Sequence, residues 1–217
     1  MEHILRKIPL FAELKDEELQ SIASHASSKT YPKNSIIINE GDETNSMYAI
    51  EKGKVKVFLC NEDGKEVILK MLGVGDYFGE LAILDAAPRS ASIMTMEPCK
   101  FSIISKSEFD QSLDAHPEIA RTLVVELTRT VRRLTENIRN LALMDVYGRV
   151  ARTLLDMTVD IDGQKVIDQK LTHQDIAKMI GSSREMVSRI MKDLQKGGYI
   201  TSESKRIIIN EKLPAGW

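Results

Sequence analysis

The stretch from Pro117 to Leu143 constrains the fold most, because it contains no glycine and no proline after its first residue. Apolar side chains recur along it at intervals of three and four residues. They are Val124, Leu127, Val131, Leu134, Ile138 and Leu141. A repeat of 3.5 residues is typical of a coiled-coil seam. We therefore predict one long helix whose seam, these six residues, pairs with a second copy in a parallel homodimer. The alternative is that the helix lies on its own chain.

The part of the chain before this helix has the pattern of a β domain. Gly41, Gly53, Gly64 and Gly75 are separated by 12, 11 and 11 residues. The segments SIIINE, KVKVFLC and KEVILKML lie between these glycines, and several alternate apolar with polar residues. Asp63-Gly64 predicts a hairpin with a type I′ turn, and the regular spacing predicts a sandwich or barrel. A short helix, DEELQSIASHA, is expected before the strands.

The part after the long helix is predicted to contain three further helices. VYGRVARTLLDM is a helical run, followed by a polar loop with Asp162-Gly163. A second helix is expected over Thr172–Met179, with Thr172 as its N-cap. After a turn at Gly181, Ser182 or Ser183 caps a third helix that runs to about Lys196. This is the layout of a helix-turn-helix, and YITSESKRIIIN predicts a hairpin beside it, a wing.

One stretch, FGELAILDAAPRSASIMTM, places two charged residues, Glu80 and Arg89, in apolar surroundings. A carboxylate and a guanidinium in such surroundings are costly unless each meets a partner. Either the two side chains satisfy each other and close the barrel, or a small polar ligand contacts both. Pro88, directly before Arg89, stiffens the approach to it.

Nearly the whole chain resembles the cAMP receptor protein/FNR family of bacterial transcription regulators. FGELAILDAAPRSAS resembles the family's phosphate-binding cassette, IGSSREMVSRIMKDL its recognition helix, and LALMDVYGRVARTLL its hinge region. The resemblance implies an α+β chain of three parts. These are an N-terminal cyclic-nucleotide-binding β-barrel of the jelly-roll type (residues 1–116), a long dimerisation helix with the hinge (117–144), and a C-terminal winged helix-turn-helix (145–217).

The resemblance implies a cyclic nucleotide as allosteric ligand. cAMP is the first choice, with cGMP, another nucleotide or no ligand as alternatives. Arg89 would donate to the phosphate, and Glu80 would accept from the ribose 2′-hydroxyl. The predicted ligand site comprises Gly79, Glu80, Leu81, Arg89, Ser90, Ala91 and Thr135. In cAMP-responsive members, two polar residues of the long helix reach the adenine. The matching positions here are Leu134 and Thr135, and Leu134 departs from the pattern.

For DNA, the resemblance implies base contacts by Arg184, Glu185 and Arg189. Arginine donates to guanine O6 and N7, and a carboxylate accepts from cytosine N4. Thr172, Ser183, Lys192 and Lys205, or its neighbour Arg206, are further predicted DNA contacts of the helix-turn-helix and the wing. The alternative is an ordinary amphipathic surface helix. Its inward face would be Met186, Val187, Ile190 and Leu194. The helix needs this apolar face whether or not its other face contacts DNA.

These features together predict a ligand-gated homodimeric regulator that places two helices in successive major grooves of a TGTGA-like palindrome. The expected partners are double-stranded DNA, a second copy of the chain and RNA polymerase. The main alternative is a DNA-binding regulator with a structural barrel, or one triggered by redox chemistry or a protein partner. An enzyme is the remote third interpretation, since no nucleophile–base arrangement is recognisable.

Composition narrows the class of protein. Apolar residues make up 42% and charged residues 29% of 217 residues, as in ordinary soluble proteins. No apolar run is long enough to cross a bilayer, so we expect a cytoplasmic protein without a membrane partner.

Two cysteines and four scattered histidines show neither a CxxC nor metal-ligand spacing, so no metal is expected. Residues 1–30 lack the cysteine cluster of the family's iron–sulfur sensors, whereas composition leaves haem open. Residues 145–217 hold 12 Lys and Arg against 10 Asp and Glu, a balance that permits DNA binding without arguing for it.

Overall fold

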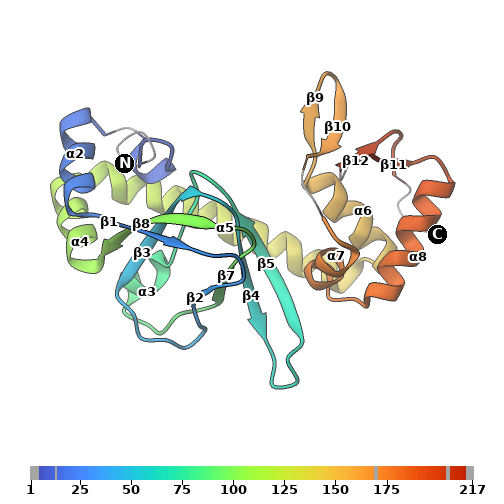
Figure 1. The fold of residues 1–217 in the computed structure, drawn as a ribbon, viewed down its shortest axis with the longest axis horizontal. Coiled ribbons are helices and arrows are strands. Elements are labelled where there is room, and N and C mark those ends of the chain that lie inside the picture. Colours follow the sequence, from blue (N-terminus) through green and yellow to red (C-terminus); the bar gives the residue numbers. More distant parts are fainter. Residues whose placement is uncertain (1–4, 13, 169–170, 204–205, 214–217) are drawn as a thin grey trace. The chain divides into compact units, whose positions relative to one another are not determined.

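The computed structural model describes residues 5–12, 14–168, 171–203 and 206–213 (Figure 1). The chain divides into two compact units, residues 1–131 and 132–217, and the division falls inside the long helix. The predicted domain limits at residues 116 and 144 stay a prediction. None of the described helices combines the length and apolar character that a bilayer crossing needs.

The first unit contains a β-barrel with helices around it. Its elements are η1 (Pro9–Phe11), α2 (Asp16–His25), β1 (Ser27–Tyr31), β2 (Ile36–Ile38), β3 (Ser46–Lys52), β4 (Val55–Cys60), β5 (Glu66–Leu72), β6 (Tyr77–Phe78), α3 (Glu80–Asp85), β7 (Ser92–Thr95), β8 (Cys99–Ser105), α4 (Lys106–Ala115) and the first half of α5 (Pro117–Leu143). The strands form two four-stranded antiparallel sheets, in the orders β1-β8-β3-β6 and β2-β7-β4-β5. The predicted β-rich domain with its long helix is confirmed.

Alternation along β3 separates two cores. Met47 and Ala49 belong to a buried cluster with the surrounding helices, whereas Ile50 belongs to the cluster between the two sheets. Successive strand residues point to opposite faces, so one sheet contacts the barrel interior and the helices at once. Ile119 and Leu123, in the first turns of α5, are buried in the helical cluster. The start of α5 is therefore part of the first unit.

The hairpin predicted at Asp63-Gly64 is confirmed, but the predicted type I′ turn is wrong. β4 pairs with β5 in antiparallel register from Val55↔Leu72 to Cys60↔Glu66. Gly64 has a φ of 76°, while Asp63 does not have a positive φ. The N–H of Gly64 donates to the carbonyl of Asn61 at 2.9 Å. The loop is longer than a two-residue type I′ turn and ends on a left-handed glycine, as in hairpins with a G1 bulge.

Two helices interrupt the segment that the sequence indicated as β. α3 follows Gly79 directly, and α4 follows β8 without a loop. Ser105 is the N-cap of α4. Its side chain accepts from the N–H of Glu108, and the Glu108 carboxylate accepts from the N–H of Ser105. This capping box is a local signal for a helix start.

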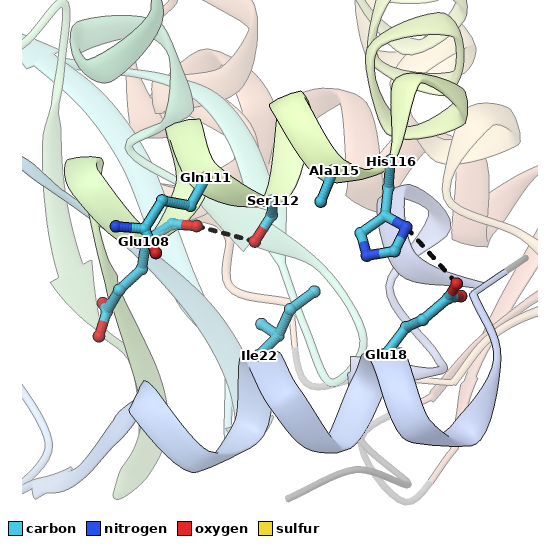
Figure 2. Close-up of a pocket in the computed structure, with 7 residues that line it drawn as sticks. All are labelled: Glu18, Ile22, Glu108, Gln111, Ser112, Ala115 and His116. Atoms are coloured by element: carbon cyan, nitrogen blue, oxygen red, sulfur yellow. Dashed lines mark hydrogen bonds and ion pairs between the residues drawn. The ribbon is translucent and has the colours of Figure 1, made fainter.

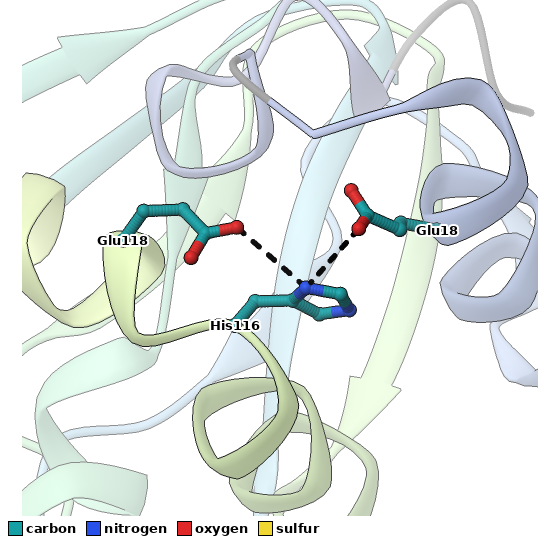
Figure 3. Close-up of side chains that lie close together, drawn as sticks. All are labelled: Glu18, His116 and Glu118. Carbon is teal, nitrogen blue, oxygen red and sulfur yellow. Dashed lines mark ion pairs between the residues drawn. The ribbon is translucent and has the colours of Figure 1, made fainter.

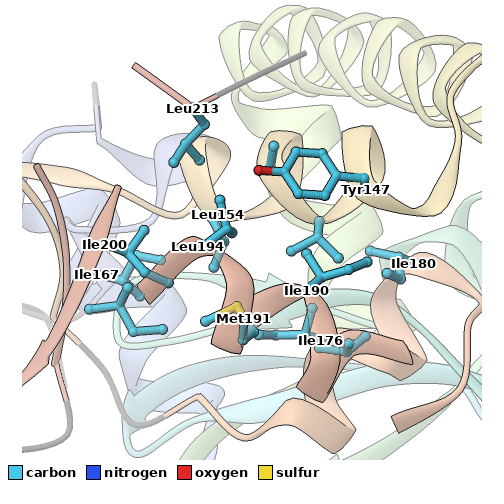
Figure 4. Packing of buried hydrophobic residues seen from close by; sticks show 14 of the residues in the cluster. Tyr147, Leu154, Ile167, Ile176, Ile180, Ile190, Met191, Leu194, Ile200 and Leu213 are labelled. Atoms are coloured by element: carbon cyan, nitrogen blue, oxygen red, sulfur yellow. The ribbon is translucent and has the colours of Figure 1, made fainter. Parts of the chain in front are cut away.

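The second unit contains a three-helix core covered by a sheet. Its elements are α6 (Val146–Asp156), β9 (Val159–Ile161), β10 (Gln164–Ile167), α7 (His173–Ile180), α8 (Arg184–Lys196), β11 (Ile200–Glu203) and β12 (Arg206–Ile209). All three helices and the sheet contribute to one buried apolar cluster, in which Leu154, Ile176 and Leu194 meet (Figure 4). The predicted helix-turn-helix and the wing strands β11 and β12 are confirmed.

The loop expected around Asp162-Gly163 is a hairpin, so that expectation was wrong. Asp162 has a φ of 52° and Gly163 a φ of 79°. Two positive φ values in succession are what a type I′ turn requires. β9 and β10 pair on either side of the turn, and β10 also pairs with β12, so the sheet has the order β11-β12-β10-β9. The wing is part of a four-stranded sheet.

Candidate functional site

Arg89 is held in a cage of main-chain and hydroxyl oxygens. It is 3% exposed. Its Nε donates to Thr44 Oγ1 at 2.6 Å, Nη1 to the carbonyl of Gly79 at 2.6 Å, and Nη2 to the carbonyl of Ser46 at 2.5 Å. A guanidinium has five N–H groups, so these three bonds leave two of them unused. Burial lowers the pKa of Arg89, and Tyr48, Glu80 and Asp42 oppose that effect.

The main chain of Arg89 is fixed as firmly as its side chain. Its N–H donates to the carbonyl of Asp42 at 2.9 Å, and its carbonyl accepts from the N–H of Gly41 at 2.8 Å. Main-chain and side-chain hydrogen bonds therefore join the loop of residues 41–45 to the cassette and hold the guanidinium in one position.

Gly79 permits the close approach of Arg89. It has a φ of 86°, in the left-handed region, and is the N-cap of α3. A Cβ at this position would lie 2.6 Å from Arg89 Nη1 and 3.0 Å from the carbonyl oxygen of Ser46. Both the backbone conformation and the contact require glycine here.

Glu80 lies near Arg89 but does not pair with it. Both residues belong to the described part of the chain, where no hydrogen bond or ion pair joins them. Burial raises the pKa of Glu80, while its own N–H, Lys70 and Arg89 favour the ionised form. The pair that would close a ligand-free barrel is therefore not formed.

The other predicted ligand residues differ in exposure and in the unit to which they belong. Leu81 is 41% exposed on α3, Ser90 is exposed and Ala91 is half-buried. Thr135 is exposed on α5, in the second unit. The structure thus brings Gly79, Glu80 and Arg89 together, while ligand binding by all seven residues stays a prediction.

Sequence analysis missed the partners of Arg89. Thr44 and Ser46 lie 45 and 43 residues away in the chain. No local pattern links them to the cassette, because β3 reaches it only through sheet pairing with β6. Tyr48, on the same strand, stacks on Phe78 with ring centroids 5.0 Å apart.

The helix-turn-helix is built on side-chain caps. Thr172 Oγ1 accepts from the N–H of Asp175 at 3.1 Å and donates to the Asp175 carboxylate at 2.6 Å. Ser183 Oγ accepts from the N–H of Met186 at 3.2 Å. Between the helices, Gly181 has a φ of 63° at the C-cap of α7. Both hydroxyl residues predicted to contact DNA, Thr172 and Ser183, therefore serve as N-caps and mark helix N-termini, where phosphates bind well.

The predicted base-contacting residues lie on the outer face of α8. Arg184, Glu185 and Arg189 are all exposed, as is Lys192. The opposite face, Val187, Ile190, Met191 and Leu194, is buried. Met191 was not expected there, and Met186 is only half-buried. α8 thus presents a charged face that its own unit does not cover.

Two contacts hold α8 in place, and neither was predicted. His173 Nδ1 lies 2.8 Å from Ser188 Oγ, which joins α7 to α8. Gln195 Nε2 donates to Ser202 Oγ at 2.8 Å, which joins α8 to the wing. Arg206 pairs with Asp168 at 2.5 Å, and Lys205 lies outside the described residues.

Most of the predicted seam is uncovered. Val124 and Val131 are each 62% exposed, Leu134 46%, Ile138 67% and Leu141 55%. Leu127 is half-buried against the first unit's helical cluster. The helix therefore packs on its own unit only at its start, and the seam beyond Leu127 is an apolar stripe open to solvent. Pairing of this stripe with a second copy stays a prediction.

The cassette, the long helix and the winged helix-turn-helix together define a transcription regulator that combines a cyclic nucleotide-binding domain with a DNA-binding domain. Residues 28–116 match the family model of the cyclic nucleotide-binding domain, and residues 148–212 match that of the Crp-like helix-turn-helix domain. The chain belongs to the cAMP receptor protein/FNR family.

Relatives support the same assignment over most of the chain. The cAMP-activated global transcriptional regulator CRP of Pasteurella multocida is 36% identical over 201 residues, which cover 89% of this chain and 95% of that protein. The catabolite activator protein of Thermus thermophilus is 28% identical, with a TM-score of 0.58 and 94% of both chains covered. The c-di-GMP responsive regulator CLP of Xanthomonas campestris, 24% identical, has a TM-score of 0.77 over 91% of this chain and 100% of its own, which shows the shared fold.

Proposed function

We propose that this protein is a homodimeric regulator gated by cAMP, which binds at the cassette and promotes binding to a palindromic TGTGA-like operator. The observation that carries the proposal is the state of Arg89. This buried guanidinium is fixed by three oxygens, keeps two further N–H groups, and lies near a carboxylate, Glu80, likewise among the described residues, with which it forms neither a hydrogen bond nor an ion pair. A cyclic phosphate would use the two N–H groups, and its ribose hydroxyl would meet Glu80.

cAMP is favoured over other cyclic nucleotides by the relatives. The Pasteurella multocida relative is named as cAMP-activated. In our proposal, Gly79, Leu81, Ser90 and Ala91 surround the phosphate and ribose. Thr135 contacts the adenine from the long helix.

The uncovered seam supports dimerisation. In a parallel pair, Val124, Val131, Leu134, Ile138 and Leu141 would bury their exposed side chains against the same residues of the second copy. The two α8 helices would then occupy successive major grooves. Arg184, Glu185 and Arg189 would contact base edges, and Thr172, Ser183, Lys192 and Lys205 the phosphates or sugars.

The cellular setting follows from this role. A regulator of bacterial transcription works beside the chromosome, in the cytoplasm, and we propose RNA polymerase as its further partner. No catalytic activity is part of the proposal, since the relatives are regulators.

The direct test is fluorescence anisotropy on a labelled TGTGA-type palindrome and on a scrambled duplex, with and without cAMP, over a range of salt. We expect cAMP to raise affinity for the palindrome. Arg184→Ala and Arg189→Ala should each cost about 1–3 kcal/mol on the palindrome and little on the scrambled duplex. Lys192→Ala should weaken binding to both duplexes equally. It should also reduce by about one the slope of log affinity against log salt concentration. Equal losses on both duplexes for the arginine variants would contradict base contact.

A second candidate function is a regulator whose barrel binds no nucleotide. Leu134 favours it, because an apolar side chain occupies a position where the family's cAMP-responsive members have a polar one. Isothermal titration separates the two candidates. Heat on adding cAMP, cGMP or c-di-GMP that Arg89→Gln abolishes supports the gated regulator. Tight palindrome binding by the bare protein, with no heat from any of the three, supports the second candidate.

A further inference from the structure

Three potential metal ligands converge where α2 meets the junction of α4 and α5 (Figure 3). Glu18 comes from α2, His116 lies between α4 and α5, and Glu118 comes from the first turn of α5. His116 Nδ1 lies 3.6 Å from Glu18 Oε1 and 3.6 Å from Glu118 Oε1. The three ligand atoms all lie within 4.8 Å of one another. All three residues belong to the first unit.

A local backbone bond orients one of the three side chains. Glu18 Oε2 accepts from the N–H of Lys15 at 2.7 Å, which leaves Oε1 for His116. The main-chain N–H of His116 donates to the carbonyl of Ser112 at 3.0 Å, which fixes the main chain of His116 at the end of α4. Outer bonds of this kind orient metal ligands and raise metal affinity.

The ligand set suits Zn²⁺. An imidazole nitrogen with carboxylate oxygens is a common zinc environment, with metal–ligand distances of about 2.0–2.2 Å. In a tetrahedron of that size, neighbouring ligand atoms lie roughly 3.3–3.6 Å apart. The two 3.6 Å distances from His116 Nδ1 lie at the upper end of that range, and the two carboxylate oxygens lie within 4.8 Å of each other. Without a cation between them, the two carboxylates that face one nitrogen would repel each other.

A cavity beside the cluster provides a path for an ion. It has a volume of about 180 Å³ and lies between α2 and α4 (Figure 2). Glu18 and His116 form part of its wall, together with Glu108 and Gln111. Suitable ligands close to one another, one of them already oriented, and an entry path are features that a metal site must combine.

We propose that Glu18, His116 and Glu118 form a site for a divalent transition metal, with Zn²⁺ as the best fit and water as a fourth ligand. The ion would link α2 to the start of α5 and so stabilise the first unit. The inference stands apart from nucleotide binding, because none of its ligands belongs to the cassette.

The test uses the full-length chain carrying Cys60→Ser, which removes an exposed thiol that could bind zinc itself. After treatment with EDTA and dialysis, ZnCl₂ is titrated in competition with a chromophoric chelator, and thermal unfolding is followed with and without zinc. We expect one equivalent to bind and the melting temperature to rise. His116→Gln and Glu118→Gln should each weaken binding at least about tenfold.

His173→Gln is the matched control, because His173 lies in the second unit and contacts Ser188. It should leave zinc affinity unchanged. If His116→Gln fails to fold, Glu118→Gln retains the test, since the Glu118 side chain is 45% exposed. Absence of zinc binding by the parent, or equal affinity in the parent and Glu118→Gln, would overturn the proposal and leave a plain ion-pair cluster.

Discussion

At the scale of single residues, the cassette depends on the absence of a Cβ atom at Gly79. Gly79→Ala would place a Cβ against the hydrogen-bonded guanidinium of Arg89 and the main-chain carbonyl of Ser46. The left-handed backbone costs alanine about 1–2 kcal/mol, and the forced contact adds roughly 1–3 kcal/mol. We expect both a lower melting temperature and weaker cyclic nucleotide binding, measured by thermal unfolding and isothermal titration.

Gly64→Ala separates the two effects. Gly64 also has a positive φ, 76°, but nothing lies within 4 Å of its added Cβ. This variant should show the backbone cost alone and keep its nucleotide affinity. Equal losses of stability in the two variants would mean that Arg89 moves aside freely, contrary to its three hydrogen bonds.

Glu80 gives a prediction about pH. Burial raises its pKa above the ordinary value of 4.5. The folded state therefore keeps the proton to higher pH than the unfolded state, and this residue's contribution to stability falls as pH rises from 4.5 through the folded pKa. We expect Glu80→Gln to be more stable than the unaltered chain at neutral pH, in urea unfolding without ligand. The difference should vanish below pH 4.5, and a difference constant across that range would refute the assignment.

The sequence revealed the two charged residues of the candidate site but not their surroundings. Glu80 and Arg89 are conspicuous because they interrupt an apolar run. Thr44 and Ser46 are not, because a hydroxyl and a carbonyl on a distant loop and strand carry no local signal. The spacing of the four histidines does not indicate the cluster around His116, because its other members are glutamates. Glu118 is a near neighbour in the sequence, whereas Glu18 lies on α2 and carries no local signal that links it to His116.

At the scale of elements, α5 gives the prediction on assembly. Ile138 is 67% exposed in the middle of the apolar stripe. Ile138→Glu would place two carboxylates in the seam of a dimer, where unpaired buried charges cost several kcal/mol. We expect the dissociation constant of the dimer to rise at least about 100-fold, or roughly 2.7 kcal/mol, in analytical ultracentrifugation.

Arg133→Glu is the control on the same helix. Arg133 is exposed and lies outside the heptad seam, so reversal of its charge should leave the dimer nearly unchanged. If the dimers of both variants are weakened equally, the charge of the helix and not the seam determines dimer stability. If neither dissociates, the apolar stripe has another role.

Elements with a long repeat or several agreeing local signals could be predicted from the sequence. α5 spans the predicted stretch without glycine or internal proline, and α7 and α8 begin after the expected caps. The missed elements are short. α4 has a capping box, and the β9–β10 hairpin has an Asp-Gly turn, so both had usable signals. α3 had none, since its six residues begin at a left-handed glycine and resemble a buried strand.

At the scale of the whole molecule, the long helix belongs to both units. It is buried at Ile119 and Leu123 in the first unit and continues as residues 132–143 of the second. In the proposed gated mechanism, this continuous helix would carry a change at its start to the residues that precede α6, provided that the dimer has two arrangements.

Such coupling must be reciprocal. If cAMP raises affinity for the palindrome by some factor, the palindrome must raise affinity for cAMP by the same factor. Allosteric couplings are typically about 1–3 kcal/mol, or roughly 5–150-fold. We expect equal factors from anisotropy titrations of DNA at saturating cAMP and from cAMP titrations of the protein with and without saturating palindrome. A scrambled duplex should produce a smaller factor in both directions, because it lacks the base contacts that favour one arrangement.

If cAMP binds and neither affinity changes, the barrel holds a nucleotide without gating the DNA-binding unit. The gated mechanism would then be wrong, even though both binding sites were correctly assigned.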